Sequence, residues 1–273
     1  MAQVLIMQKI IKLFKAIWLL LKRPALFNLI LKDEEVLKIE FKKVFPSLEL
    51  QELDPFAWTE AQELNITPYA FLSGSSMVTD FALLQILCRK YKVETYLEIG
   101  TWRGESAANV APFVKEVFTL NLPDSTLRSM GQTPHYINSH RFFSKDIKNI
   151  THLFGDSATF DWQPYAQKCD LVFIDGDHAT EAVLRDTQTA LGLRKAADSI
   201  LVWHDAKQDA EYPRYDVLLG IYKALPTHMH SNVFLVKHAL CAVYLPDALM
   251  AQAIEINALP KRVFELRLTQ KEY

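Results

Sequence analysis

Two carboxylates and an imidazole stand within four residues of one another in the segment DLVFIDGDH. Asp175 ends an apolar run, and Asp177 and His178 follow it directly. Carboxylates this close repel one another unless they share a cation, a proton or a substrate. The segment therefore indicates a site of acid–base or metal chemistry rather than a surface that only favours solubility.

A second polar group, His204-Asp205, follows the next apolar run in the sequence ILVWHDA. These two residues would face Asp175 if the two runs are neighbouring parallel strands. Oxygen ligands of this kind suit Mg²⁺, and the imidazole leaves Mn²⁺, Fe²⁺ or Zn²⁺ open. Local capping or hydrogen bonding is the alternative role for His178 and for His204.

A glycine-containing loop, IGTWRGES, follows an earlier apolar run that ends with Glu98-Ile99. Gly100 would let the backbone turn sharply and approach a ligand, and Gly104 would let the next helix start close to the strand. The free N–H groups at such a helix start favour a carboxylate or phosphate. The loop is neither GxGxxG nor a P-loop, which argues against dinucleotides and nucleoside triphosphates. An ordinary strand–loop–helix turn is the alternative.

Polar residues that could bind a nucleoside also follow two further apolar runs of the sequence. Asn121 lies about 20 residues beyond the loop, where Rossmann-like sites place an acid on the ribose hydroxyls. An amide binds hydroxyls more weakly than a carboxylate does, and Asp124 is a nearby alternative. Asp156 and Ser157 follow the next run, and they also suit a plain turn.

The sequence has seven short apolar runs, and the polar residues above lie at or after the first five of them. The runs are 95–99, 116–122, 150–154, 169–174, 199–203, 233–236 and 240–245. Continuous apolar runs suit strands that are buried on both faces, and helical stretches lie between several of them. The pattern predicts an α/β fold with a doubly wound, Rossmann-like, seven-stranded, mostly parallel sheet. The last two runs would pair as an antiparallel edge. Ligands of such sheets bind at the carboxyl ends of the strands.

The first 76 residues are expected to form an N-terminal helical extension or cap, and residues 77–273 the ligand-binding domain. Residues 1–23 have the pattern of a basic amphipathic helix. Its lysines face away from the apolar positions Ile6, Ile10, Phe14, Ile17 and Leu21. The uncharged stretch is too short to cross a bilayer. The apolar side would pack on the body or on a twin subunit, or lie on a membrane surface as a peripheral contact.

Charge and cysteine content limit the binding partners and the cellular location that the protein can have. The formal net charge of −2 argues against nucleic acid as a partner. The three cysteines lie far apart and form no CxxC pair, which favours a reducing, cytoplasmic location. We also expect a homo-oligomer, and the N-terminal helix adds membrane association as an alternative location.

The segments LEIGTWRGES, VFTLNLP, LFGDSATFDW, CDLVFIDGDHATEAVLRDTQTAL and ILVWHDA, taken in order, resemble the class I S-adenosylmethionine-dependent methyltransferases. They are most similar to bacterial methyltransferase family 24, which is related to the macrocin-type O-methyltransferases. The resemblance covers about residues 77–246. It implies S-adenosylmethionine as the cofactor, with contacts from Glu98, Gly100, Thr101, Gly104, Ser106, Asn121, Asp156, Ser157 and Asp175.

The metal-dependent relatives imply roles for the acidic cluster. Asp175 would be a metal ligand, Asp177 the base, and the pair His204-Asp205 would complete a site for Mg²⁺ or another divalent cation. The histidine in that pair departs from the relatives, which carry two acids there. The hypothesis is that Asp177, helped by His178 or His204, deprotonates a hydroxyl held at Asp175 and Asp205.

The acceptor would be a small polar molecule, such as a sugar or glycoside. Loops 124–149 and 206–216 lie where an acceptor pocket would be, and their candidate contacts are Arg128, His135, His140, Arg141 and Tyr212. Two other functions stay open: different chemistry at the same metal site, such as hydrolysis or hydroxylation, and a non-catalytic binding protein with this fold.

Overall fold

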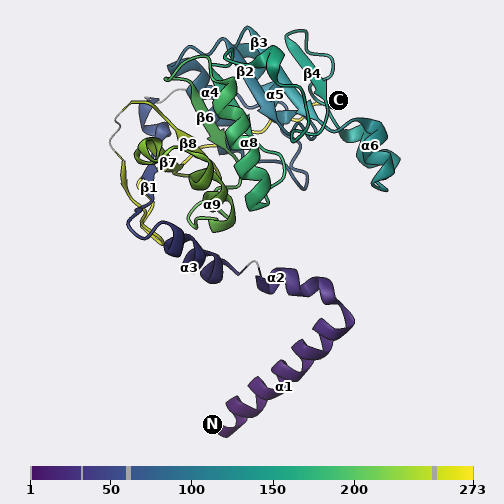
Figure 1. The fold of residues 1–273 in the computed structure, drawn as a ribbon, viewed down its shortest axis with the longest axis vertical. Coiled ribbons are helices and arrows are strands. Elements are labelled where there is room, and N and C mark those ends of the chain that lie inside the picture. Colours follow the sequence, from purple (N-terminus) through teal and green to yellow (C-terminus); the bar gives the residue numbers. More distant parts are fainter. Residues whose placement is uncertain (1, 32, 60–62, 248–250, 273) are drawn as a thin grey trace.

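The computed structural model describes residues 2–31, 33–59, 63–247 and 251–272, and in these ranges one sheet is flanked by helices (Figure 1). The strands are β1 (Gln51–Leu53), β2 (Thr95–Ile99), β3 (Glu116–Asn121), β4 (Ile150–Phe154), β5 (Leu171–Ile174), β6 (Ile200–Trp203), β7 (Val233–Val236), β8 (Ala242–Tyr244) and β9 (Gln252–Ala253). The helices are α1 (Ala2–Lys22), α2 (Phe27–Leu31), α3 (Glu34–Val44), α4 (Val78–Lys90), α5 (Glu105–Val110), α6 (Asp124–Ser129), α7 (Pro134–Ser139), α8 (Thr180–Leu193) and α9 (Tyr215–Ala224).

The sheet has the order β4-β3-β2-β5-β6-β8-β7-β1-β9 over the described residues. The predicted α/β fold with a mostly parallel sheet is confirmed, and so is the antiparallel pairing of the last two predicted runs, now β7 and β8. The predicted count of seven strands is wrong, because β1 and β9 extend the sheet beyond β7. These two strands have only three and two residues, too few for a readable hydrophobic period.

Alternate side chains of the central strands enter two separate cores, one on each face of the sheet. Leu97, Val172 and Leu201 pack in the core that α8 and α9 cover. Tyr96 and Phe173 pack in the opposite core, which α4 and α5 cover. Burial on both faces explains why the strands read as continuous apolar runs.

The parallel register brings three strand ends to one edge of the sheet. Ile99 of β2 pairs with Ile174 of β5, and Ile174 pairs with Trp203 of β6. The residues that follow these pairs therefore emerge side by side.

The N-terminal segment divides into two parts. Helices α1 and α2 extend away from the sheet (Figure 1), with a short 3₁₀ turn at Pro24–Leu26 between them. Helix α3 packs on α9 instead, where the ring of Phe41 lies 5.6 Å from Tyr215 and 5.8 Å from Tyr222. A domain division at residue 76 stays a prediction, and β1 within that extension is part of the sheet. None of the described helices is both long and apolar enough to cross a bilayer.

Asp170 joins the starts of β2 and β5. Its carboxylate accepts hydrogen bonds from the Glu94 and Thr95 amides at 3.0 and 2.9 Å and lies 3.0 Å from the Lys195 ammonium. Burial alone would raise the pKa of Asp170, but these donors outweigh it and the pKa is lowered. The resulting stability is present above the pKa of the unfolded chain and is lost as pH falls through the folded value.

We expect Asp170→Asn to lower the free energy of unfolding at neutral pH by about 1–3 kcal/mol. The difference from the unsubstituted protein should shrink as pH falls below about 4. Urea unfolding at several pH values measures both effects. A difference that stays constant down to acidic pH would contradict the assigned role of the carboxylate.

Candidate active site

The loop between β2 and α5 depends on two glycines with positive φ, Gly100 at +101° and Gly104 at +79°. A Cβ atom on Gly100 would lie 2.0 Å from the backbone oxygen of Asp175, and one on Gly104 would lie 2.0 Å from the Ser144 hydroxyl oxygen. The sequence suggested that Gly100 clears space for a ligand. The structure shows that the space is filled by protein, because the loop lies directly against the backbone that follows β5.

Glu98 lies under this loop and is completely buried. Its carboxylate accepts hydrogen bonds from Tyr96 Oη at 2.9 Å and Thr119 Oγ1 at 3.1 Å, and Ser106 also donates to it. Burial raises the pKa of Glu98 to about 8. Thr101 is buried too and its hydroxyl contacts that of Thr119. The side chains of Glu98, Thr101 and Ser106 thus hydrogen-bond to other groups of the protein and fix the base of the loop. Direct contacts from them to a cofactor stay a prediction.

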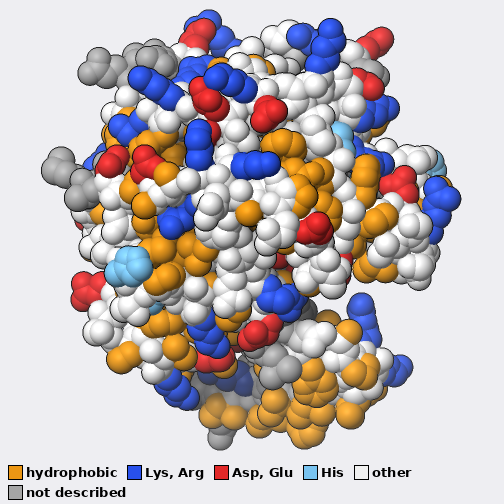
Figure 2. Space-filling view, turned by 45° about the horizontal axis from the view of Figure 1, so that its top comes forward, with side chains coloured by type: hydrophobic (Ala, Val, Ile, Leu, Met, Phe, Trp, Pro, Cys, Tyr) orange, Lys and Arg blue, Asp and Glu red, His pale blue; other side chains and the backbone are white. Residues whose placement is uncertain are grey.

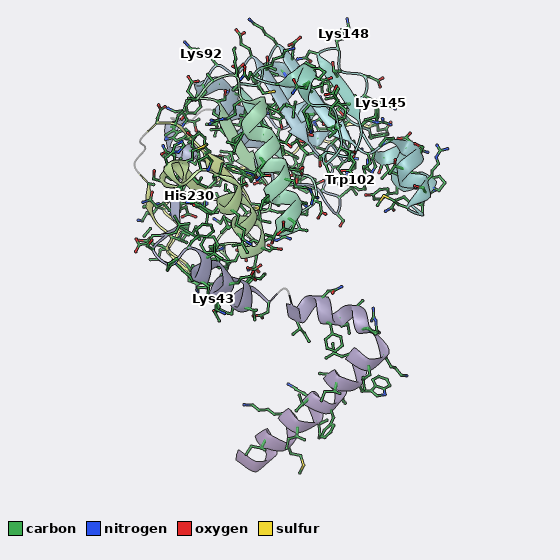
Figure 3. All side chains as sticks on the ribbon, viewed as in Figure 1. Lys43, Lys92, Trp102, Lys145, Lys148 and His230 are labelled. Atoms are coloured by element: carbon green, nitrogen blue, oxygen red, sulfur yellow. The ribbon has the colours of Figure 1, made fainter. Side chains whose placement is uncertain are left out.

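Asn121, at the end of β3, contacts a buried histidine. Its Nδ2 lies against Nδ1 of His140, whose ring packs 4.7 Å from Trp102 and 4.9 Å from Tyr136. Burial lowers the pKa of His140, which favours the neutral ring. If Nδ1 accepts from the Asn121 amide, the ring proton is on Nε2. Among the described residues, His140 Nε2 and Trp102 Nε1 are buried without a hydrogen-bond partner. Figure 3 places Trp102 beside the α6 arm.

The turn after β4 lies next to Asn121, because the Gly155 amide donates to the Asn121 carbonyl at 3.0 Å. Asp156 is exposed and its carboxylate accepts from the Ala158 amide at 2.9 Å. Ser157 donates its hydroxyl to the Asp186 carboxylate. The neighbouring strand ends thus bring the two predicted nucleoside-binding segments together.

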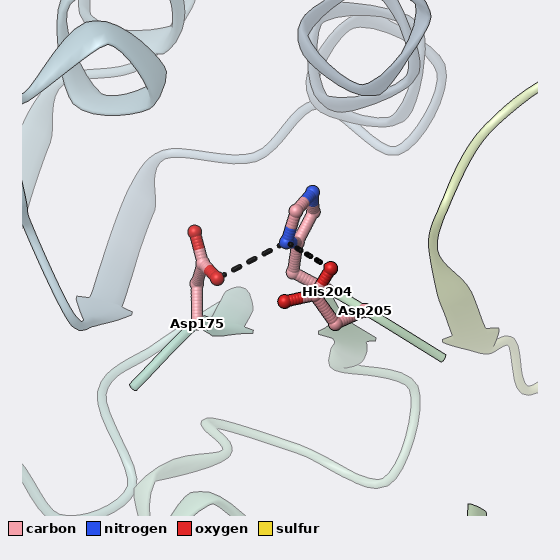
Figure 4. Close-up of side chains that lie close together, drawn as sticks. All are labelled: Asp175, His204 and Asp205. Atoms are coloured by element: carbon pink, nitrogen blue, oxygen red, sulfur yellow. Dashed lines mark ion pairs between the residues drawn. The ribbon is translucent and has the colours of Figure 1, made fainter. Parts of the chain in front are cut away.

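Asp175, His204 and Asp205 gather where β5 and β6 end (Figure 4). His204 Nδ1 lies 3.1 Å from Asp175 Oδ1 and 3.5 Å from Asp205 Oδ1. One potential ligand atom from each residue lies within 4.8 Å of the other two. Nδ1 is buried and, among the described residues, makes no well-aligned hydrogen bond despite its short contact with Asp175.

The other nitrogen of His204 contacts a carboxylate from α4 that no sequence pattern indicated. Asp80 Oδ2 lies 3.2 Å from His204 Nε2, and the Asp80 carboxylate also accepts from the Met77 and Leu240 amides at 2.7 Å each. Burial lowers the pKa of His204, but the carboxylates around it outweigh that effect and raise the pKa well above its usual value. In sequence, Asp80 looks like an ordinary acid in the first turn of a helix.

Asp205 joins this cluster to His178. Asp205 Oδ2 lies 3.1 Å from His178 Nε2 and 3.7 Å from an Arg214 nitrogen. Burial opposes ionisation of Asp205, but the contact with His204 and its charge, together with His178 and Arg214, lower its pKa to about 2. Asp177 is exposed, and its carboxylate accepts from the Ala179 amide at 3.0 Å, which orders the start of α8.

The five candidate acceptor contacts lie in different surroundings. His140 is buried beside the loop, whereas Arg128, His135 and Tyr212 are exposed. Arg141 pairs with Asp124 at 3.1 Å and stacks on Phe154. Helices α6 and α7, which carry or flank four of these residues, project from the sheet as an arm (Figure 1).

Two cavities lie apart from these groups. One, of about 570 Å³, is lined by residues that include Glu52, Trp58 and Arg262. The other, of about 370 Å³, has Tyr91 and Asp170 among its lining residues. Neither is lined by the glycine loop or by the Asp175–His204–Asp205 cluster, so neither forms part of the candidate site.

Comparison with known proteins finds a family similarity in the central part of the chain. Residues 97–206 match the model of a methyltransferase domain family, Methyltransf_24. No curated protein sequence matches this one. An O-methyltransferase from Bacillus cereus, solved with S-adenosylhomocysteine, is similar in structure with a TM-score of 0.44 and 16% identity, over 81% of this chain and 96% of that one. The O-methyltransferase TomG from Streptomyces achromogenes, solved with S-adenosylmethionine, has a TM-score of 0.40 and 18% identity, over 63% and 81%.

The family match spans the glycine loop, Asn121 and the whole Asp175–His204–Asp205 cluster. Residues 97–206 are therefore similar to a methyltransferase domain, and the matched stretch includes the strand ends that form the candidate site.

Proposed function

We propose that this protein transfers a methyl group from S-adenosylmethionine to a hydroxyl of a small polar acceptor, such as a sugar or glycoside. One observation carries the proposal: the Gly100 loop lies against the backbone of Asp175, whose side chain belongs to the His204 cluster. A methyl donor on the loop and a hydroxyl at Asp175 and Asp205 would therefore be neighbours. Alignment of this kind contributes roughly 7–11 kcal/mol to a transfer reaction.

The polar groups beside the loop fit a nucleoside cofactor, which supplies the electrophilic methyl group when bound. With its amide nitrogen on His140, Asn121 has its amide oxygen left to accept a ribose hydroxyl. The buried, unpartnered N–H groups of Trp102 and His140 are further donors beside the loop. Buried donors without partners are costly, so a polar ligand that accepts from them would bind favourably.

The residues after β5 and β6 fit a divalent cation. Asp175, His204 and Asp205 would be its ligands, and the misaligned, buried Nδ1 of His204 is the nitrogen that would face it. Asp80 holds Nε2, an arrangement that fixes the ring orientation of metal-binding histidines. The mixed nitrogen and oxygen set favours Mn²⁺, Fe²⁺ or Zn²⁺ over Mg²⁺. Such a cation lowers the pKa of a bound hydroxyl.

Asp177 and His178 are the two residues that could accept the proton of the hydroxyl. The family resemblance indicates Asp177, but its carboxylate is engaged with the Ala179 amide. His178 donates from Nε2 to Asp205, which leaves Nδ1 as the acceptor of a proton. A base oriented by a carboxylate in this way follows the general pattern of acid–base sites, so the geometry supports His178.

We expect His178→Asn to lower the rate of methyl transfer by about 10²–10⁴-fold, the usual contribution of a positioned base. Asp177→Asn, the matched control on the adjacent residue, should lower it less than about 10-fold, since an amide oxygen can still accept from the Ala179 N–H. The assay follows labelled methyl groups from S-adenosylmethionine into a small-molecule extract of the source cells, and mass spectrometry then identifies the acceptor. The reverse order of the two effects would assign the base to Asp177.

The proposal extends to the cellular compartment, the oligomeric state and the partners of the enzyme. Cys88, Cys169 and Cys241 are buried and unpaired, which supports a reducing compartment such as the cytoplasm. Homo-oligomer formation and the absence of a nucleic-acid partner stay predictions, the second supported by the net charge of −2.

A further inference from the structure

Helix α1 exposes a broad apolar surface. Ile6, Ile10, Phe14, Ile17 and Leu21, on one side of the helix, are each between 45% and 75% exposed. Met7, Ile11 and Trp18 widen the same side and are also exposed. Figure 2 shows hydrophobic side chains gathered at the lower end of the molecule, and Figure 1 has the N-terminal helices at that end. An exposed apolar surface of this extent indicates an interaction site.

The other side of α1 is positively charged. Lys9, Lys12 and Lys15 lie there, Lys22 lies at the border with the apolar side, and residues 1–32 contain six basic and no acidic side chains. The acids that give the whole chain its negative net charge all follow this segment. Lys22 lies 4.2 Å from the Trp18 ring, so one end of the helix combines an aromatic ring with a cation. Tryptophan and lysine in this combination suit the boundary between lipid and water.

We propose that α1 binds in the plane of an anionic membrane surface. Its apolar side covers about 140° of the helix circumference at 100° per residue, which is wider than the narrow seam through which two helices pair. It has too many charges to cross the bilayer. The lysines complement anionic lipid headgroups, which attract basic segments next to the membrane.

The membrane-binding segment is joined to the body beside the active site. Helix α2 ends at Leu31 and α3 begins at Glu34, whose carboxylate accepts from the Tyr215 amide at 3.0 Å. The residue before Tyr215 is Arg214, which contacts Asp205. Membrane binding therefore attaches the protein at the edge of the sheet that carries the Asp175–His204–Asp205 cluster.

Sedimentation of the full-length protein with vesicles tests this proposal. We expect binding to phosphatidylcholine vesicles with about a third phosphatidylserine, weaker binding at high NaCl, and little binding to phosphatidylcholine alone. The triple variant Lys9→Gln, Lys12→Gln, Lys15→Gln should bind the anionic vesicles about 100-fold more weakly, given the attraction per lysine. Ile10→Glu with Phe14→Glu should not bind.

The matched control is Val36→Glu with Ile39→Glu, which changes two residues on α3 that are 54% and 57% exposed. It should bind as the unsubstituted protein does, and circular dichroism with urea unfolding checks that every variant is folded. Equal binding to neutral and anionic vesicles would overturn the proposal. So would an absence of vesicle binding together with an oligomer that Ile10→Glu and Phe14→Glu dissociate, because the apolar side would then cover a second copy. Neither readout depends on methyl transfer.

Discussion

Replacement of Gly100 with alanine is expected to destabilise the protein by about 3–5 kcal/mol and to abolish binding of S-adenosylmethionine. The added Cβ would lie 2.0 Å from the backbone oxygen of Asp175 and 2.9 Å from the Gly176 nitrogen, and backbone atoms cannot rotate away. The φ of +101° is also unfavourable for any residue with a Cβ. The loop would have to move away from β5, which separates it from the Asp175–His204–Asp205 cluster. Urea unfolding and calorimetry with S-adenosylmethionine measure the two effects.

Gly192→Ala provides the matched control for Gly100. Gly192 lies in α8, and a Cβ there would meet no atom within 4 Å. Because alanine is the better helix former, this change should stabilise the protein by up to about 1 kcal/mol and leave cofactor binding unchanged. If Gly100→Ala were as stable as Gly192→Ala and still bound the cofactor, the close contact between the loop and β5 would be incorrect.

His204→Ala is expected to lower the free energy of unfolding by about 3–5 kcal/mol and to remove metal binding. The imidazole lies between Asp80 on one side and Asp175 and Asp205 on the other. Without it, the completely buried Asp80 carboxylate loses its nearest cation. Unpaired buried charges are strongly destabilising.

His228→Ala is the control for this change, since His228 is exposed. It should alter stability by less than about 0.5 kcal/mol and leave Mn²⁺ binding intact. Urea unfolding and titration with Mn²⁺ cover both variants. A His204→Ala protein as stable as His228→Ala would show that His204 does not hold the three carboxylates together.

The hydrophobic runs were sufficient to locate the central strands, because strands buried on both faces need apolar residues at every position. Residues 95–99, 150–154 and 233–236 are strands with the predicted bounds. β1 could not be predicted: it has three residues, and its buried Glu52 pairs with the Lys207 ammonium, 3.0 Å away. That partner is distant in sequence, and no local pattern reveals it.

Part of the candidate site could be predicted from the sequence for a related reason. Asp175, His204 and Asp205 each follow a strand, and parallel strand ends meet at one edge of a sheet. Asp80 and Arg214 reach the same cluster from helix ends, where acidic and basic residues are common for local reasons. The placement of His140 on Asn121 depends on how the segment after α7 folds back, which residue spacing does not determine.

We propose that the glycine loop and the Asp175–His204–Asp205 cluster form one site for a sulfonium nucleoside and a divalent cation. Isothermal calorimetry with S-adenosylmethionine and S-adenosylhomocysteine, each with and without Mn²⁺, tests it most directly. We predict that both nucleosides bind, and that Mn²⁺ binds to the unsubstituted protein but not to His204→Ala. Binding of Mn²⁺ without either nucleoside would indicate different chemistry at the same cluster. Binding of neither would contradict the methyltransferase function and favour a non-catalytic protein with this fold.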